Sequence, residues 1–240
     1  MEEYKKKNDI VLIIPAYNEA GNIERVVDEL IAGYPMLDYV VVTDGPTDGT
    51  DAICRERGYN TVFLPQNMGL AKCFQNGMKY ALSKGYEYAV QFDGDGQHRP
   101  QYIGAMREKA LCGYDLVLGS RFIPSQGENE ADKKEYKMSG LRSLGSFLIR
   151  LSLKLKTGKK VTDPTCGLRL YSRKLIKEFA ENDGYAPEPD TLAKLLKEGI
   201  SFAEVGVRVS EREEGESYLN PKSAVKYMWR MLSSIISGKN

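Results

Sequence analysis

Two aspartates one residue apart follow an apolar run near the middle of the chain. The stretch reads YAVQFDGDGQHRP over residues 88–100, and it places Asp93 and Asp95 directly after a predicted buried strand. Carboxylates at this spacing can direct oxygen ligands into one cavity, which suits a hard divalent cation shared with substrate phosphates. Such a cation would neutralise a diphosphate leaving group. The pair therefore predicts a metal-assisted reaction of a diphosphate substrate.

The same stretch is compatible, at first sight, with three other structures. An EF-hand loop beginning at Asp93 needs glycine at its sixth position and glutamate at its twelfth, where the chain has His98 and Gly104. A dinucleotide fingerprint needs a third glycine where Arg99 stands, and Asp95 would face the pyrophosphate with like charge. A simple turn explains an isolated DGDG equally well, because Asp and Gly are common turn residues. The surrounding elements must decide.

The composition indicates a globular chain with no strong preference for nucleic acid. Of 240 residues, 42% are hydrophobic and 28% charged, and 34 basic residues nearly balance 33 acidic ones. Four cysteines without a CxxC pair and the single His98 exclude a Cys/His metal cluster and favour reduced thiols in the cytosol. The N-terminal MEEYKKKND does not resemble a signal peptide, and no run reaches the roughly 20 apolar residues that span a bilayer.

Apolar runs alternate with helical patterns through the first half of the chain. The runs are short and continuously apolar, which is typical of strands buried on both faces of a parallel sheet. We predict strands at 9–15, 38–44, 60–65, 87–93 and 114–120, and helices at 18–35, 47–58, 69–85 and 100–112. Asn18 is the expected N-cap of the first helix. This alternation predicts an α/β fold with a mostly parallel central sheet covered by helices.

Polar loops follow four of these strands. They occupy residues 15–19, 43–50, 93–98 and 119–122. Ligands of such sheets bind at the carboxyl ends of the strands, so the four loops are expected on one rim. This context favours a functional site over a simple turn at Asp93 and Asp95. The chain contains no GxxxxGK[ST] phosphate loop, and a nucleotide-sugar fits better than ATP.

The second half is less regular. Residues 124–137 are polar and predict a surface loop, whereas 139–160 predict a helix whose apolar stripe we expect to face the core. That stripe consists of Leu141, Leu144, Phe147, Leu148, Leu151 and Leu155. A short strand and a helix follow within 161–180, then a helix at 187–199 and a strand at 201–212. The tail, 221–240, predicts an amphipathic helix that either lies on a membrane surface or packs against the domain.

An ordered set of motifs resembles the family 2 glycosyltransferases. The motifs are IIPAYNEAGNI (13–23), VVTDGPTDGT (41–50), QFDGDGQHRP (91–100), LGSRF (118–122), VTDPTCGLRLYSRK (161–174), PEPD (187–190) and EREEGESYL (211–219). The resemblance is strongest to the polyprenyl-phosphate branch that includes dolichol-phosphate mannose synthase. It implies a single Rossmann-like domain of the GT-A type over 1–219. Its nucleotide-sugar-binding half would be 1–123 and its acceptor-side half 138–219, followed by a C-terminal amphipathic helix at 220–240.

The resemblance also implies roles for individual residues. The donor nucleotide would be held by Pro15, Tyr17, Glu19, Asp44 and Asp93, with Arg212 closing on the diphosphate. Mg²⁺ or Mn²⁺ would be bound by Asp93, Asp95 and Gln97. The acceptor phosphate would be bound by Arg121, Arg142 and Arg169, while Glu188 and Asp190 lie near the position of a catalytic acid in other members. Asp95 and Arg212 would serve the chemistry by stabilising the leaving group.

The chain also departs from the family pattern at four positions. The usual DDGS reads Thr43, Asp44, Gly45, Pro46, so one carboxylate expected at the base or ribose is missing. Cys166 replaces a usual serine, and Tyr218 stands where the mannose-synthase branch often has lysine. These differences bear on the choice of donor and acceptor.

The function implied is metal-dependent, inverting transfer of a sugar from a nucleotide-sugar to a polyprenyl phosphate for cell-surface glycan synthesis. The enzyme would be cytoplasmic and peripheral at the inner face of the cell membrane, without nucleic-acid partners. A homodimer or a membrane-protein partner is left open. Two alternatives are kept: transfer to a sugar hydroxyl of a surface polysaccharide, and a non-catalytic nucleotide-sugar-binding or membrane-recruited subunit.

Overall fold

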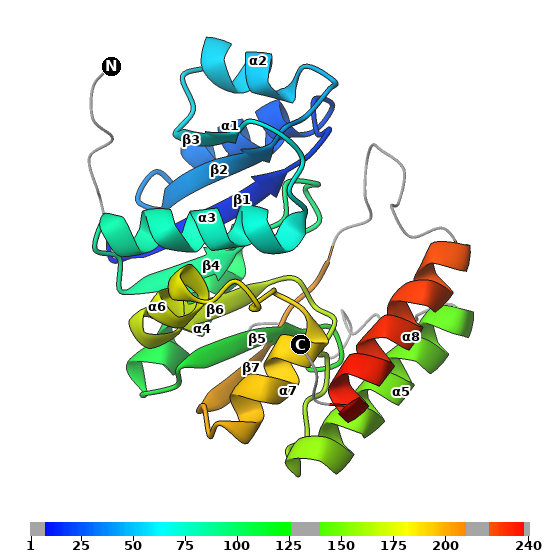
Figure 1. The fold of residues 1–240 in the computed structure, drawn as a ribbon. Coiled ribbons are helices and arrows are strands. Elements are labelled where there is room, and N and C mark those ends of the chain that lie inside the picture. The colour runs from blue at the N-terminus through cyan, green and yellow to red at the C-terminus, as the bar shows by residue number, and fades with distance from the viewer. Residues whose placement is uncertain (1–7, 126–139, 210–220, 238–240) are drawn as a thin grey trace.

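The computed structural model describes residues 8–125, 140–209 and 221–237, and their strands form one sheet (Figure 1). The sheet order is β3-β2-β1-β4-β6-β5-β7. The strands are β1 (Ile10–Ala16), β2 (Asp38–Asp44), β3 (Thr61–Leu64), β4 (Tyr88–Gln91), β5 (Leu116–Ser120), β6 (Arg169–Ser172) and β7 (Phe202–Gly206). The helices are α1 (Ile23–Gly33), α2 (Thr50–Glu56), α3 (Leu70–Ser83), α4 (Ile103–Leu111), α5 (Gly140–Thr157), α6 (Arg173–Glu181), α7 (Pro189–Lys197) and α8 (Pro221–Ser237), with a short 3-10 turn η1 (Pro100–Tyr102). The predicted α/β fold with a mostly parallel sheet is confirmed.

One strand runs against the others and brings a further loop to the rim. β1 pairs in parallel with β2 and β4, β2 with β3, and β5 with β7, but β6 is antiparallel to both β4 and β5. Gln91 at the end of β4 lies opposite Arg169 at the start of β6. The segment before β6 therefore enters the sheet at the edge where β1, β2, β4 and β5 end.

The apolar strands separate two hydrophobic layers. On one face, α3, α6 and α7 pack on the sheet, with α5 and α8 contributing Ile149, Leu153, Met231 and Ile235 to the same cluster. On the other face, α1 and α4 pack over the alternate residues of β1, β4 and β5. Because side chains alternate along a strand, a central strand flanked by two helical layers must be apolar throughout.

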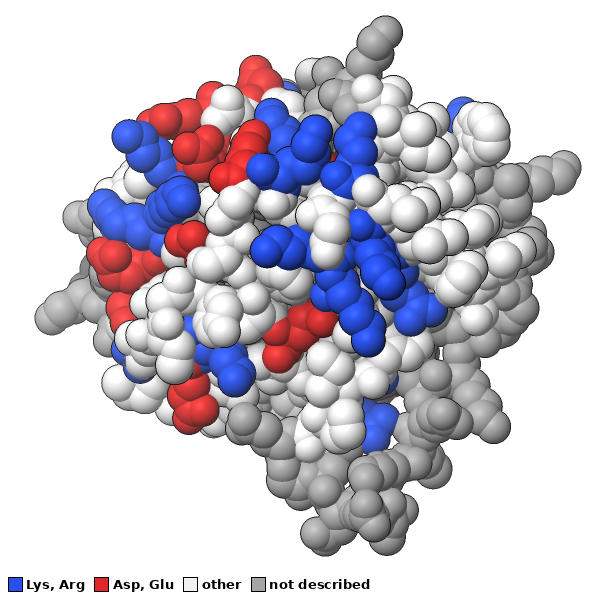
Figure 2. Space-filling model, turned by 90° about the horizontal axis from the view of Figure 1, so that it is seen from below, with Lys and Arg blue, Asp and Glu red and all other residues white. Residues whose placement is uncertain are grey.

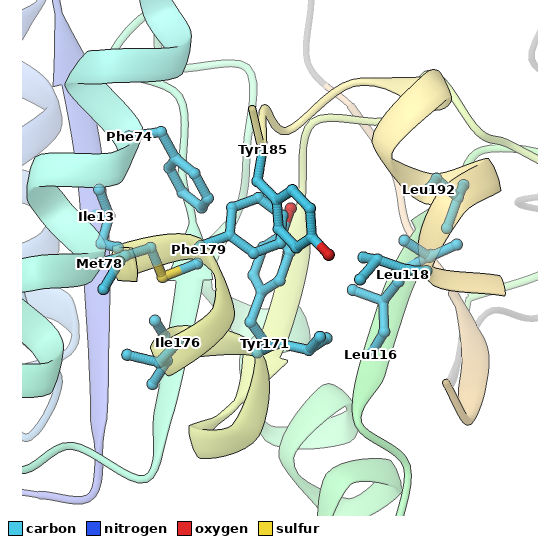
Figure 3. Close-up of a cluster of buried hydrophobic side chains, with 14 of the residues drawn as sticks. Ile13, Phe74, Met78, Leu116, Leu118, Tyr171, Ile176, Phe179, Tyr185 and Leu192 are labelled. Carbon is cyan, nitrogen blue, oxygen red and sulfur yellow. The ribbon is translucent and has the colours of Figure 1, made fainter. Parts of the chain in front are cut away.

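Aromatic rings fill the first of these layers (Figure 3). Phe179 of α6 lies at the centre, with its ring centroid 5.8 Å from that of Phe74, 5.1 Å from that of Tyr171 and 5.2 Å from that of Tyr185. Edge-to-face and tilted packing of this kind adds about 0.5–1.5 kcal/mol per pair beyond the buried area. The cluster joins α3, α6 and the loop before α7, and so fixes the position of the segment that leads to Glu188.

The apolar stripe predicted to bury α5 in the core is mostly exposed, so that prediction was wrong. Leu144, Phe147, Leu151 and Leu155 are exposed, and the buried positions of α5 include Ile149 and Leu153 instead. Apolar periodicity alone cannot tell which side of a helix with apolar residues all round will meet the core. Here α5 packs beside α8 at one end of the sheet rather than across it (Figure 1).

The start of α1 also differs from the prediction. The helix begins at Ile23 with Asn22 at the N-cap position, whereas Asn18 lies in a left-handed turn with φ of 55°. Asn18 Oδ1 accepts a hydrogen bond from the Thr47 backbone N–H at 2.8 Å, so its side chain joins two loops instead of capping a helix. Within the described residues, no helix combines the length and the hydrophobicity needed to cross a membrane.

The predicted halves, 1–123 and 138–219, both contribute strands to the single sheet. The predicted boundary between 219 and 220 and nearly all of the predicted surface loop at 124–137 lie outside the described residues.

Candidate active site

A cavity of about 530 Å³ opens at the rim where the parallel strands end. Its lining comes from the loops after β1 and β4, the segments before α3, β6 and α7, and one residue of α8. Sequence reasoning placed eight residues that prove to line it: Pro15, Tyr17, Glu19, Asp44, Asp93, Asp95, Arg169 and Glu188. The structure therefore brings together residues predicted for the donor, the metal, the acceptor and the catalytic acid.

The loop after β1 is held by side-chain contacts to its neighbours. Glu19 Oε2 accepts a hydrogen bond from Asn22 Nδ2 at 2.9 Å, and the Glu19 backbone N–H donates to Thr50 Oγ1 at 3.0 Å. These contacts fix the carboxylate beside Pro15 and Tyr17 in the cavity wall. A carboxylate and an aromatic ring side by side suit the hydroxyl groups and the ring of a nucleoside.

Asp44 holds a second loop as well as lining the cavity. Its two carboxylate oxygens accept hydrogen bonds from the Met68 and Gly69 backbone N–H groups, each at 2.8 Å. Gly45, with φ of 60°, packs so closely on Gln66 that a Cβ atom there would clash with its backbone. The segment before α3 is thereby drawn into the cavity wall. Sequence reasoning missed this segment, because its position depends on Asp44 rather than on a motif of its own.

Asp93 and Asp95 lie together in the cavity wall after β4. Asp95 Oδ1 accepts a hydrogen bond from the Gln97 backbone N–H at 3.0 Å, which orients the carboxylate. The side chain of Asp93 is 37% exposed, and its Oδ2 lies 3.6 Å from His98 Nε2. The Asp93 backbone N–H donates to His98 Nδ1 at 3.1 Å. The buried His98 therefore supports the turn that presents both acids, a role that its sequence position did not reveal.

The two carboxylates suit a divalent cation that is shared with a substrate. Within the described part of the chain, no group of three His, Cys, Asp or Glu side chains could hold a metal alone. Mg²⁺ is usually held by one or two carboxylates together with substrate phosphates and water, so two carboxylates such as Asp93 and Asp95 would suffice as protein ligands. Gln97 does not line the cavity; its backbone supports Asp95 instead.

The segment before β6 forms the floor beside these acids. A Cβ atom at Gly167 would lie 2.5 Å from Asp93 Oδ2, so any larger residue there would displace the Asp93 carboxylate. Arg169 is buried, and its guanidinium donates to the Cys166 carbonyl at 2.9 Å and to the Pro164 carbonyl at 2.7 Å. Arg169 thus both fixes the loop and brings a positive charge to the cavity.

Arg121 lies behind this loop rather than in the cavity lining. Its Nε and Nη2 donate to the two oxygens of Asp163 at 2.6 and 2.8 Å, and Nη2 also donates to Thr165 Oγ1 at 2.8 Å. The Asp163 side chain is fully buried. Burial would raise the pKa of Asp163, but the hydrogen bonds and charge of Arg121 outweigh burial and leave this pKa below its ordinary value. The geometry supports a positioning role for Arg121, and its predicted contact with the acceptor phosphate stays a prediction.

The opposite wall is built from α7 and α8. Glu188 lines the cavity, and its Oε1 accepts a hydrogen bond from Arg230 Nη2 at 2.6 Å. Burial raises the pKa of Glu188, although the nearby Arg230 opposes the shift. Asp190 lies outside the cavity lining and accepts a hydrogen bond from Ser234 Oγ at 3.0 Å. Of the two predicted acids, only Glu188 therefore lines this cavity.

Tyr227 of α8 is a cavity residue that sequence reasoning missed. Burial raises the pKa of its hydroxyl to about 12, so the side chain stays neutral at ordinary pH. The side chain of Arg142, at the start of α5, and the whole of Arg212 lie outside the described residues. Their predicted roles stay predictions.

Comparisons with known proteins agree with this geometry. The family model for glycosyl transferase family 2 matches residues 11–179. Polyprenol monophosphomannose synthase from Mycolicibacterium smegmatis is 26% identical, with 95% of this chain and 88% of the relative aligned. UDP-N-acetylglucosamine–dolichyl-phosphate N-acetylglucosaminyltransferase from Methanococcus voltae is 31% identical, over 83% of this chain and 84% of the relative.

A solved structure shares the fold. Glucosyl-3-phosphoglycerate synthase from Mycobacterium tuberculosis, in complex with Mn²⁺, uridine diphosphate and phosphoglyceric acid, superposes with a TM-score of 0.66 at 21% identity, covering 95% of this chain and 76% of that one. The family model spans well over half of the chain, and it includes the loops that carry Glu19, Asp44 and the Asp93–Asp95 pair. The chain therefore belongs to glycosyl transferase family 2.

Proposed function

We propose that this protein transfers a sugar from a nucleotide-sugar to a polyprenyl phosphate. The observation that carries the proposal is the cavity itself, which joins two carboxylates at the end of β4 to Arg169 in the floor beside them and to Glu188 in the opposite wall. Two relatives, aligned over 95% and 83% of this chain, are named for polyprenol or dolichyl phosphate, which supports the same acceptor class here.

The donor would lie along the ends of β1, β2 and β4. Tyr17, Glu19 and Asp44 would contact the nucleoside, with Pro15 shaping the loop. Asp93 and Asp95 would hold Mg²⁺ or Mn²⁺ beside the diphosphate. When bound, the cation supplies charge neutralisation for the departing nucleoside diphosphate. Arg212 would add a charge-assisted contact to the same diphosphate, a role taken from the resemblance of its motif.

The acceptor would enter from the side of Arg169, Glu188 and Tyr227. A phosphate oxygen of the acceptor attacks the anomeric carbon on the face opposite the nucleotide. One bond forms between this oxygen and the sugar, and the bond from the sugar to the nucleoside diphosphate breaks, so the configuration inverts. An ionised phosphate has no proton to lose, and the step needs no general base. Arg169, and Arg142 on α5, would stabilise the acceptor's negative charge.

A second acceptor class is favoured by one observation. Glu188 lies in the cavity wall, and burial raises its pKa, which are properties of a general base for a sugar hydroxyl. If the acceptor is a hydroxyl of a polysaccharide, Glu188 would take its proton as the bond to the sugar forms. A non-catalytic subunit is less well supported, because both Asp93 and Asp95 are present in the cavity.

The direct test is an assay with a panel of nucleotide-sugars, Mg²⁺ or Mn²⁺ and a short-chain, detergent-soluble polyprenyl phosphate. Release of nucleoside diphosphate together with a new glycosylated lipid phosphate is expected for one donor. Parallel reactions with oligosaccharide acceptors test the hydroxyl alternative. Release only with oligosaccharides would overturn the proposed acceptor, and tight nucleotide-sugar binding without turnover of any acceptor would point to a binding subunit.

A further inference from the structure

The outward side of α5 exposes a row of large apolar side chains. Leu144, Phe147, Leu151 and Leu155 recur every three or four residues, and their exposed fractions range from 41% to 79%. This spacing places them on one face of the helix, opposite the buried Ile149. An apolar row of this length on a soluble surface commonly marks an interaction site.

α8 extends the row. Trp229 and Ile236 are 74% and 67% exposed and lie two turns apart on one side of α8. The two helices run side by side in the same direction (Figure 1). Met228 packs on Gly145 near one end, and Lys156 Nζ donates to the Ile236 carbonyl near the other. The exposed apolar residues of both helices, here called the α5–α8 face, therefore border one seam.

The charges of these two helices have a single sign. α5 contains Arg142, Arg150, Lys154 and Lys156, α8 contains Lys222, Lys226 and Arg230, and neither helix contains Asp or Glu. Lysines in the last turn of α5 are favoured by the helix dipole, but the absence of acids over two whole helices is not explained in this way. The chain as a whole is nearly neutral, so the bias is local.

More lysines lie next to the end of this helix pair. Lys159 and Lys160 follow α5 and are exposed. A hollow of about 530 Å³ beyond the seam is lined by Lys156, Lys194 and Lys197 together with Ser234, and also by the acids Asp190 and Glu198. Figure 2 shows Lys and Arg gathered near the middle of one face of the molecule, beside an uncharged surface toward the right.

We propose that the α5–α8 face docks on a membrane that contains anionic lipids. Apolar and aromatic side chains on two helices whose own charged residues are all basic match the acyl boundary and negative headgroups of such a membrane. Tryptophan in particular favours the interface between headgroups and acyl chains. A second copy of the chain would place like charges against like charges across the same face, so the charge pattern favours a bilayer over a homodimer.

Docking at this face would bring the cavity close to a lipid acceptor in the membrane. This step of the argument rests on the proposed lipid-phosphate acceptor. Tyr227 lines the cavity on one side of α8, and Trp229, about 200° further round the helix, is exposed on the α5–α8 face. Arg230 joins α8 to Glu188 in the cavity wall. A membrane bound at this face would therefore lie about one helix diameter, on the order of 10–12 Å, from the acceptor side of the cavity, where the phosphate of a lipid-anchored acceptor must enter.

The protein carries its own probe for this proposal. Trp229 is the single tryptophan of the chain, so its fluorescence reports on this face alone. Vesicles of phosphatidylcholine with and without phosphatidylglycerol would be added to the full-length protein, without donor or acceptor. A blue shift of the emission and co-sedimentation with the anionic vesicles are expected, both weakened by salt. Unchanged emission and no co-sedimentation would overturn the proposal.

Matched variants test which surface binds. Leu155→Glu should weaken anionic-vesicle binding by about tenfold or more, because a buried apolar contact is replaced by a charge. Leu111→Glu is the control, since Leu111 is 58% exposed on α4, which packs on the opposite face of the sheet. Lys154→Glu should weaken binding by about fivefold or more and Lys177→Glu, on α6, should have little effect. Equal losses in variant and control would overturn the assignment.

Two further measurements separate this proposal from its alternatives. Sedimentation equilibrium without vesicles should show that the wild-type protein is monomeric. If the wild type self-associates and Leu155→Glu abolishes that self-association, the face binds a second copy and not a membrane. The short-chain acceptor assay is independent of docking. Vesicle binding without transfer would leave the docking proposal standing and remove the proposed function, whereas transfer without vesicle binding would do the reverse.

Discussion

The two walls of the cavity are built in different ways. The donor wall consists of loops at the ends of β1, β2 and β4, whose backbones are fixed by the sheet and whose acids are oriented by backbone N–H groups. The acceptor wall consists of the segment before β6 and the ends of α7 and α8. Its charged side chains are held by partners far away in the sequence, Arg121 to Asp163 and Arg230 to Glu188.

We infer from this difference that the donor wall fixes the reacting groups, whereas the acceptor wall controls how the acceptor enters the cavity. A rigid wall of strand ends can hold two acids in register for a cation and a diphosphate, which demand fixed geometry. Helices joined by side-chain contacts can shift relative to one another, and α8 exposes apolar residues on its other side. The four predictions below test this contrast, from the largest expected effect to the smallest.

The first prediction concerns the donor wall. Asp95→Ala should lower the rate of transfer on the order of 10³-fold or more, because several kcal/mol of charge stabilisation at the diphosphate is lost. The fold should be unchanged, since the carboxylate lies in a loop at the rim of the sheet and accepts a hydrogen bond from its own turn. Steady-state rates, circular dichroism, and Mn²⁺ affinity in the presence of nucleoside diphosphate provide the measurement.

Asp183→Ala is the matched control, because that carboxylate is 78% exposed and pairs with Lys72 at the surface. It should retain full activity. Transfer by the Asp95→Ala enzyme that also survives EDTA would contradict a metal role for this wall.

The second prediction concerns the buried pair behind the acceptor wall. Arg121→Ala should lower the free energy of unfolding by about 3–5 kcal/mol, because it leaves the Asp163 carboxylate buried without its partner. Arg107→Ala is the control, since the Arg107–Asp9 pair is partly exposed, with side-chain accessibilities of 42% and 32%. That change should cost no more than about 1 kcal/mol. Urea titrations of the two variants make the comparison, and equal midpoints would contradict the positioning role of Arg121.

The third prediction follows from the lowered pKa of Asp163. In the wild type, the stabilisation by ionised Asp163 is complete above the unfolded pKa of about 3.9 and is lost as pH falls through the lower folded pKa. In Arg121→Ala, burial dominates, so protonation of Asp163 relieves the cost instead. The stability difference between the two proteins should therefore begin to narrow above pH 4, as pH falls through the raised pKa of Asp163 in the variant. It should narrow further below about 4, where the wild type loses its own stabilisation. Unfolding curves at several acidic pH values check this, and a constant difference would exclude Asp163 as the cause.

Most residues of the donor wall could be predicted from the sequence, because each of its loops is encoded by a short contiguous motif. An apolar run followed by PAYNE, TDGP or DGDG indicates a strand and its polar end without any knowledge of the tertiary structure. The loop before α3 was not readable, since nothing in its own sequence indicates that Asp44 binds its backbone.

The acceptor wall was readable only in part. Its two ion pairs each join residues 42 positions apart, and such pairing is decided by the packing of helices and by the antiparallel insertion of β6. Tertiary packing also decides which side of α5 is buried, and for this reason the prediction that its apolar stripe faces the core was wrong. A helix with apolar residues on two sides gives the same periodicity whether its second side meets protein or lipid.

The last prediction has the smallest expected effect and decides between the two acceptor classes. Glu188→Gln removes the charge that could act as a base but keeps the size of the side chain in the cavity wall. If the acceptor is a lipid phosphate, no proton is taken from it, and kcat should fall by less than about tenfold. Asp190→Asn is the matched control, because Asp190 likewise bonds to α8, through Ser234, but lies outside the cavity lining. Both changes loosen the contact between α7 and α8, so similar, small effects would assign them to that contact. If Glu188→Gln alone cost roughly 10² to 10⁴ in rate, the scale of a lost general base, the acceptor would be a hydroxyl.

The dependence of the transfer rate on pH gives a second measurement that separates the two acceptor classes. For a phosphate acceptor, Arg230→Met, which removes a group that lowers the pKa of Glu188, should leave the profile in place. For a hydroxyl acceptor, the same change should move its acidic limb to higher pH, because the base then protonates more readily.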